Sequence, residues 1–157
     1  MQVVNHFPPA DFEGIYAQIA ELGVLTGQID GAADLVAQMR SDIDEIAASA
    51  VAHDVPLTYF HEVGTEYYSA TSATFVGNIY GLAAMVNIAD PADEDGSQFG
   101  FPLLNEEFII DSDPDIIFLA DTIGYGQTAA TVAARPGWEA MSAVVNGRIV
   151  ELNDDIV

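Results

Sequence analysis

The chain has no cysteine and no lysine, and its only arginines are Arg40, Arg135 and Arg148. Without cysteine there is no disulfide, no thiolate nucleophile and no Cys-ligated metal. The 3 arginines stand against 25 Asp and Glu residues, which gives a formal net charge of -22 over 157 residues. Binding to nucleic acid depends on neutralising phosphates with basic side chains, so the sequence predicts no nucleic-acid partner.

The acidic residues are spread from Asp11 to Asp155 rather than gathered in one block. Such acidity attracts a cationic or metal-bearing partner, or solvates the whole surface in a saline medium, where charges are screened over roughly 10 Å or less. The even spread favours general solvation.

Long apolar runs are also missing, because no segment is long and apolar enough to span a bilayer. The first residues lack the basic and apolar regions of a signal peptide, so for an exported protein we expect the signal upstream of this sequence. A hydrophobic content of 50% and a mean hydropathy of +0.25 nevertheless predict a folded chain with a real core.

Apolar periodicity and turn residues predict an α/β order of elements. A helix follows Asp11 and ends near Gly23, and a long amphipathic helix runs from about Asp30 to before Pro56. The later elements are a strand over 57–61, a helix over 73–85, a loop over 90–100, a short helix capped by Asn105, a buried strand over 116–119 and a further helix. The Asn146-Gly147 pair predicts a type I′ hairpin between Val144-Val145 and residues 149–152. The fold class is therefore a three-layer, Rossmann-like α/β lobe with a mostly parallel sheet, preceded by a long helix.

Two loops are candidate binding surfaces. Ligands gather at the carboxyl ends of parallel strands, which singles out the loop 121–127, although an ordinary crossover turn explains it equally well. Tyr67 and Tyr68 directly follow a strand and can offer ring faces to a large ligand, or cover the sheet end instead. Phe99 and Phe101 occupy a second loop that can approach the same edge, whereas Trp138 is expected to anchor its helix to the core.

Catalytic and metal motifs are weak. His61, Glu62 and Glu66, with His53, could form a carboxylate and imidazole metal site, but HEVGTE is not HExxH and lies on a strand and turn. No serine lies in a GxSxG motif, and there is neither a phosphate loop nor GxGxxG. The sequence predicts no catalytic residue, no resident metal and no cofactor.

Several segments together resemble one family. They are FHEVGTEYYSATSATFVGNI, VNIAD, FPLLNEEFI, SDPDIIFLAD and RPGWEAMSAVVNGRIVELNDD. As a set they resemble the carboxy-terminal lobe of class III periplasmic binding proteins, the substrate-binding components of cobalamin and ferric-siderophore ABC importers. LGVLTGQIDGAADLVAQM resembles the segment that leads into the helix joining the two lobes of that family. The resemblance implies an amino-terminal helix and inter-lobe helix over 1–54 and a carboxy-terminal lobe over 55–157, with most of the first lobe expected outside this sequence.

The resemblance also implies a function. It implies a non-enzymatic component that binds a corrinoid or an iron chelate of the siderophore or haem type between two lobes and delivers it to an ABC transporter permease. The location implied is extracytoplasmic, periplasmic or as a cell-surface lipoprotein, with membrane contact only through the permease or a lipid anchor. The scarcity of arginine tilts the ligand towards a neutral or cationic species. Alternatives are a transition-metal-ion binding protein and an interaction or sensor module with the lobe fold.

The resemblance assigns roles residue by residue. Ligand-facing positions match Tyr67, Tyr68 and Phe101, with Asp121 and Asp154 along the cleft rim. A surface glutamate at the start of the short helix docks onto permease arginines in this family, which assigns Glu107 to docking, with Glu106 as the neighbouring alternative. Stabilisation of the helix amino terminus is the simpler explanation for these two acids.

Overall fold

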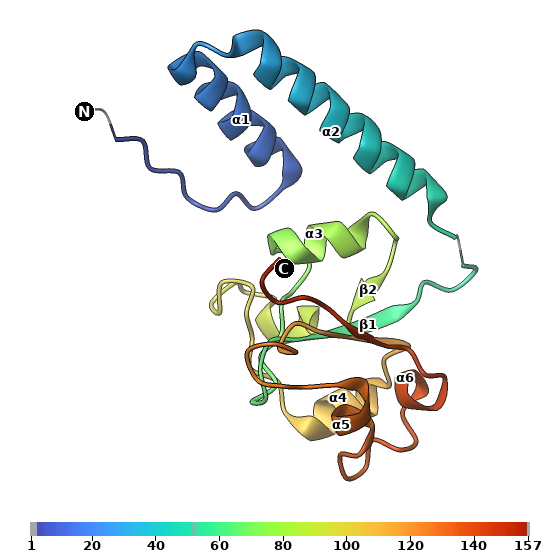
Figure 1. Cartoon of the computed structure of the whole chain (residues 1–157). Coiled ribbons are helices and arrows are strands. Elements are labelled where there is room, and N and C mark those ends of the chain that lie inside the picture. The colour runs from blue at the N-terminus through green and yellow to red at the C-terminus, as the bar shows by residue number, and fades with distance from the viewer. Residues whose placement is uncertain (1–2, 52, 157) are drawn as a thin grey trace. The chain divides into compact units, whose positions relative to one another are not determined.

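The computed structural model describes residues 3–51 and 53–156 and divides into two compact units, Met1–Val51 and Ala52–Val157 (Figure 1). The predicted boundary between residues 54 and 55 lies in the same connection between the units, ahead of the first strand. None of the helices in the part of the chain that is described is long and apolar enough to cross a membrane.

The first unit is a pair of helices, α1 (Phe12–Thr26) and α2 (Ile29–Ser49). Asp11 caps α1 as predicted, because its Oδ1 accepts from the backbone N–H of Gly14 at 2.8 Å. The helix ends at Gly27, whose φ is 73°, and not near Gly23. Gly23 instead lies where the helices touch: a Cβ there would lie 2.4 Å from the Cβ of Ala32, so its lack of a side chain serves packing rather than termination.

One charged contact ties α2 to α1. Both guanidinium nitrogens Nη1 and Nη2 of Arg40 donate to the carboxylate of Glu13 at 2.6 Å, and the guanidinium lies 4.2 Å from the ring centroid of Tyr16. None of the described side chains of α2 is fully buried within the chain, and its apolar face is half-buried at Ala32, Val36, Met39, Ile43 and Ala47.

The second unit is built on a parallel sheet with strand order β2-β1-β3-β4. The strands are β1 (Thr58–Glu62), β2 (Val86–Asn87), β3 (Ile116–Leu119) and β4 (Ile149–Glu151). All three pairings are parallel, with Glu62 opposite Leu119 and Leu119 opposite Glu151, so the carboxyl ends of β1, β3 and β4 meet at one edge. The predicted three-layer α/β class with a mostly parallel sheet is confirmed.

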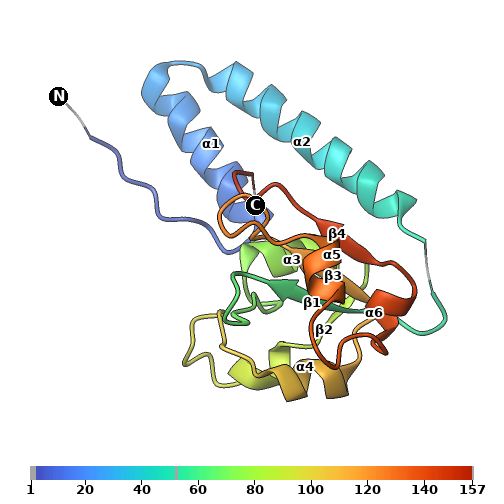
Figure 2. The same cartoon turned by 60° about the horizontal axis from the view of Figure 1, so that its bottom comes forward.

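Helices and turns cover both faces of this sheet (Figure 2). On one face, Tyr59, His61 and Phe118 pack with Tyr80 of α3 (Phe75–Gly81). The other face carries the main core, which lies between the sheet and the helices α4 (Glu106–Ser112), α5 (Ala129–Ala133) and α6 (Ser142–Val145) with the turns around them. Its buried side chains include Phe60, Ile109, Ile117, Leu119, Val132, Trp138, Met141 and Ala143.

The predicted Asn146-Gly147 hairpin is wrong. Residues 142–145 form α6, and β4 joins the sheet parallel to β3 rather than pairing with the preceding segment. Gly147 has a φ of 63°, and the backbone N–H of Arg148 donates to the carbonyl of Ala143 at 2.7 Å, so the glycine closes the end of a helix. Asn-Gly serves both kinds of turn, and the first backbone N–H and hydroxyl of α6 are held by Asp113, which favours the helix.

Other helix boundaries differ by a few residues. Thr74 caps α3, which ends at Gly81 rather than near Met85 because the chain turns through Ala84 with a φ of 54°. The expected loop 90–100 contains a 3₁₀ helix, η1 (Asp90–Asp93). The cap of α4 is confirmed, since Asn105 Oδ1 accepts from the N–H of Phe108 at 2.8 Å.

Candidate functional site

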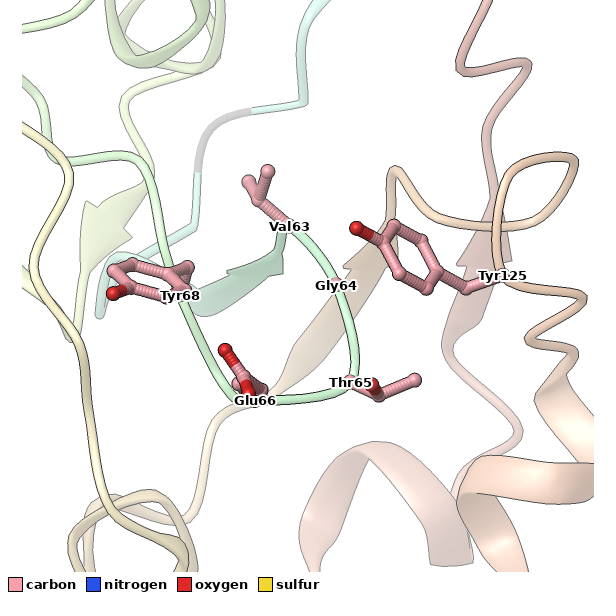
Figure 3. A pocket seen from close by; sticks show the side chains of 6 residues that line it. All are labelled: Val63, Gly64, Thr65, Glu66, Tyr68 and Tyr125. Carbon is pink, nitrogen blue, oxygen red and sulfur yellow. The ribbon is translucent and has the colours of Figure 1, made fainter.

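A pocket opens beside the carboxyl ends of β1 and β3, where the loops 63–68 and 121–127 follow the strands. Its volume is about 320 Å³. The lining residues are Val63, Gly64, Thr65, Glu66, Tyr68 and Tyr125 (Figure 3). Parallel α/β sheets bind ligands at this edge, so the pocket is the candidate site.

Two phenol rings and one carboxylate give the pocket its chemistry. Tyr68 and Tyr125 are 41% and 67% exposed. In Figure 3 Tyr68 and the Glu66 carboxylate lie on one side of the backbone of residues 63–65, and Tyr125 lies on its other side. Gly64 has a φ of 96°, a conformation that favours glycine, and a Cβ there would lie in ordinary contact with the Tyr125 ring at 3.7 Å. The predicted Tyr68 therefore lies at the pocket, and so does Tyr125 of the predicted loop 121–127.

Asp154 shapes the loop that carries Tyr125. Its carboxylate accepts from the backbone N–H groups of Gly124 at 2.7 Å and Ile123 at 2.8 Å, and from the hydroxyl of Thr122 at 2.9 Å. These hydrogen bonds, led by that from Gly124, lower the pKa of Asp154 to about 2. The observed contacts of Asp154 are thus internal ones, and direct contact with a ligand stays a prediction.

Asp121 lies beneath the same loop and is 1% exposed. Its backbone carbonyl accepts from the N–H groups of Tyr125 and Gln127, but neither of its carboxylate oxygens has a hydrogen-bond partner in the described part of the chain. Burial, together with the charge of nearby Glu62, raises the pKa of Asp121 to about 7. In this chain Asp121 is thus buried beneath the loop, and a ligand contact for it stays a prediction.

The guanidinium of Arg135 is held by other side chains of the chain. Its Nη1 and Nη2 donate to the two carboxylate oxygens of fully buried Glu62 at 2.7 and 2.6 Å, and Nη2 also donates to Gln127 at 3.0 Å. The guanidinium carbon lies 5.4 and 4.6 Å from the ring centroids of Tyr67 and Trp138. These contacts hold the guanidinium on several sides, so it has little left to offer a ligand.

Tyr67 packs against the protein. Its ring stacks on Trp138, with centroids 6.0 Å apart, and its hydroxyl donates to Glu106 at 3.4 Å. The residue is half-buried and has a φ of 66°. The contact that the structure shows is the packing alternative, and a ligand contact for Tyr67 stays a prediction. Trp138 is buried in the core as expected, although in the turn between α5 and α6 rather than in a helix.

The two glutamates at the start of α4 have different surroundings. Glu106 Oε1 accepts from the indole N–H of Trp138 at 2.9 Å, so this carboxylate serves the interior. Glu107 is exposed and has no hydrogen-bond partner within the described residues. Of the two, Glu107 is the side chain available to a partner protein.

Phe101 lies outside the pocket lining. It is 49% exposed in the loop 98–103, where Phe99 is 88% exposed with a φ of 55°. A ligand contact for Phe101 stays a prediction. The loop with Gly124, Tyr125 and Gly126 was expected at the binding edge, and Tyr125 lines the pocket. Glu66 was considered only for a metal site, and its position next to Tyr67-Tyr68 was the signal for a place in the pocket.

The alternative metal site of His61, Glu62 and Glu66 is wrong. Successive strand residues point to opposite faces: His61 Nδ1 lies 2.9 Å from the hydroxyl oxygen of Tyr80, whereas Glu62 binds Arg135 on the core face. Burial lowers the pKa of His61 to about 4. Within residues 3–51 and 53–156, no three His, Asp or Glu side chains come together as a group that could hold a metal ion.

Comparison with known proteins agrees with this architecture. Residues 2–156 match the model of a family described as periplasmic binding protein. A cobalamin-binding protein of Halobacterium salinarum is 31% identical over 146 residues, covering 90% of this chain and 38% of that protein. The ABC transporter substrate-binding lipoprotein YvrC of Bacillus subtilis is 27% identical over 150 residues, covering 93% of this chain and 45% of its own length. The chain thus spans less than half the length of these curated relatives.

Solved structures share the fold. A possible iron-binding, periplasmic solute-binding protein from Staphylococcus epidermidis matches with a TM-score of 0.82 and 24% identity, covering 96% of this chain and 57% of that one. The periplasmic vitamin B12 binding protein BtuF of Vibrio cholerae matches with a TM-score of 0.70 and 22% identity, covering 94% and 55% of the two chains.

Proposed function

Because this chain belongs to the periplasmic binding protein family, we propose that it is part of the solute-binding component of an ABC importer. Its role is binding and delivery rather than catalysis. The solute is a corrinoid or an iron chelate of the siderophore or haem type, held against the pocket at the ends of β1 and β3.

The observation that carries this proposal is the pocket lined by Tyr68 and Tyr125 at the carboxyl edge of the parallel sheet. Ring faces suit large, partly apolar ligands such as a corrin or a porphyrin. The name of the Halobacterium relative, a cobalamin-binding protein, points to the same class of ligand.

The pocket on this lobe alone does not enclose a ligand of that size. Ligand pockets usually bury most of the ligand surface, and this pocket of about 320 Å³ opens to solvent beside exposed Tyr125. The chain spans less than half of the curated relatives, and α2 has no described side chain buried within the chain. Tight binding is therefore proposed to need a second lobe, with α2 as the connection between the lobes.

Delivery requires a surface for the permease. Glu107 is exposed at the start of α4, and its neighbour Glu106 is occupied by Trp138. The proposed contact is an ion pair between Glu107 and arginines of the permease, as the family resemblance implies. The proposed location is extracytoplasmic, with a signal or lipid anchor upstream of the sequence given.

A titration of the whole protein that contains this chain tests the function. Cobalamin, a ferric hydroxamate and haem are each titrated by calorimetry, with the 157-residue chain alone as the control. Binding of at least one of them by the whole protein, with weaker binding by the chain alone, is expected. The proposal fails when the whole protein binds none of the three.

A further inference from the structure

We propose that the pocket at the ends of β1 and β3 receives a positively charged group of the solute, with Glu66 as its counter-charge and the rings of Tyr68 and Tyr125 as its walls. This inference rests on the proposed function and narrows the solute to a cationic chelate or corrinoid, or one that carries a basic arm. Glu66 thereby becomes a residue that determines specificity.

The pocket lining contains a carboxylate and no basic side chain. Glu66 is exposed, and it forms no hydrogen bond or ion pair within the described residues. Figure 3 shows its carboxylate between the Tyr68 ring and the loop that faces Tyr125. A ligand group that enters here meets a carboxyl group without a partner among the described residues.

None of the three arginines of the chain neutralises the negative charge of Glu66 at the pocket. Arg135 is bound to Glu62 and Gln127, and Arg40 in the other unit is bound to Glu13. Arg148 directly precedes β4, so in a parallel sheet it lies at the amino-terminal edge, opposite the edge with the pocket. Among the described residues, the pocket at the ends of β1 and β3 therefore has no arginine free to bind an anionic ligand.

Further acids strengthen the negative field at this edge. Asp154 anchors the loop of Tyr125 and is ionised at neutral pH, because its pKa is lowered by the hydrogen bonds that it accepts. The overall charge of -22 adds a background of the same sign. An anionic ligand group would be repelled, whereas a cation would be attracted.

The two rings fit the same conclusion. A cation near the face of a phenol ring is attracted by the ring quadrupole, and a carboxylate nearby adds charge attraction. An ammonium or guanidinium group beside the Tyr68 ring would gain the attraction of the ring and that of the Glu66 carboxylate. A neutral group of the same shape would gain neither.

A matched pair of ferric chelates isolates this charge. Ferrioxamine B carries one protonated amine on a hydroxamate chelate, and its N-acetyl derivative is the same chelate without the charge. Both are titrated into the whole protein that contains this chain and into its Glu66→Gln variant, with Glu45→Gln on exposed α2 as the control. We expect the cationic chelate to bind about threefold to thirtyfold tighter in the wild type and in Glu45→Gln. In Glu66→Gln most of this difference should disappear.

Equal affinity for both chelates in the wild type overturns the inference, as does a preference that survives in Glu66→Gln. A second probe, n-butylammonium followed by NMR, separates this result from a failure of the proposed function. Shifts of the Tyr68 and Tyr125 ring signals that are lost in Glu66→Gln support the cation site even when neither chelate binds. The absence of such shifts in the wild type contradicts it.

Discussion

Asp121 and Glu62 are buried side by side at the ends of the neighbouring strands β3 and β1, and only Glu62 holds a cation, the guanidinium of Arg135. Two buried carboxylates with one arginine leave an excess negative charge, which a proton on Asp121 removes. The pKa of Asp121 is accordingly raised to about 7 by its burial and by the charge of Glu62.

This relationship predicts a pH dependence of stability. Folded Asp121 keeps its proton up to about pH 7, whereas in the unfolded chain it loses it near its ordinary pKa of 3.8. The folded state binds more protons in this window, so the Asp121 contribution is fully present at low pH and is lost as pH rises from about 4 to about 7, by at most about 1.4 kcal/mol per pH unit. Asp121→Asn removes this slope and should gain stability relative to the wild type at pH 8.

Urea unfolding at pH 5 and pH 8 checks this prediction, with exposed Asp155→Asn as the control. His61 contributes in the opposite direction. Its pKa is lowered from 6.5 to about 4, so its contribution to stability is lost as pH falls from about 6.5 to about 4. The comparison of variants, and not the wild-type curve alone, therefore carries the test. A pH 8 gain in Asp121→Asn no larger than in Asp155→Asn would refute the raised pKa.

Removal of Arg135 should destabilise the second unit strongly. Arg135→Met leaves the carboxylate of Glu62 buried without its partner, which costs about 3–5 kcal/mol. The matched control Arg148→Met changes an exposed arginine and should stay within about 0.5 kcal/mol. The double variant Glu62→Leu with Arg135→Met should recover much of the loss, as measured by urea unfolding. Equal stability of Arg135→Met and the control Arg148→Met would show that the ion pair between Arg135 and Glu62 contributes nothing.

The two glutamates of α4 should separate stability from transport. Both Glu106→Ala and Glu107→Ala lose the favourable charge at a helix amino terminus, worth about 0.3–1 kcal/mol. Glu106→Ala also leaves the buried indole N–H of Trp138 without its acceptor, which adds about 1–3 kcal/mol. Thermal unfolding measures the difference between the two variants.

Uptake assays with the whole protein complete this test. Glu107→Ala should lower transport while ligand affinity stays the same, because its side chain faces away from the interior. A loss of ligand affinity in Glu107→Ala would place this residue in the ligand cleft instead of the docking surface.

Salt should stabilise the chain. A net charge of -22 repels itself in the compact state, and raising ionic strength from 0.1 to 1 M shortens the screening length from about 10 to about 3 Å. The melting temperature should rise by at least about 2–4 °C, the shift for about 1 kcal/mol in a chain of this size. NaCl and KCl at equal ionic strength should act alike, since screening depends on charge. An unchanged or falling melting temperature argues against general solvation by the acids.

Local signals in the sequence were reliable where one segment decides its own structure. The apolar run of β3, the cap of α4 by Asn105 and the long α2 depend on neighbouring residues, and the structure contains them. Asn146-Gly147 was ambiguous because the same dipeptide closes a hairpin or a helix, and only the pairing of β4 with β3 decides. The buried pair of Glu62 and Asp121 depends on strand order, which no local pattern encodes.

Titration of variants of the pocket residues is the most direct test of the central claim, which is that the solute binds at the ends of β1 and β3. The whole protein, its Tyr68→Ala and Tyr125→Ala variants and the control Tyr16→Phe in α1 are titrated with whichever of cobalamin, a ferric hydroxamate or haem the wild type binds. Each pocket variant removes one ring and should weaken binding by about 1–3 kcal/mol, roughly fivefold to 150-fold, while Tyr16→Phe leaves it unchanged. Full affinity in both pocket variants would show that the solute binds elsewhere and would contradict the account.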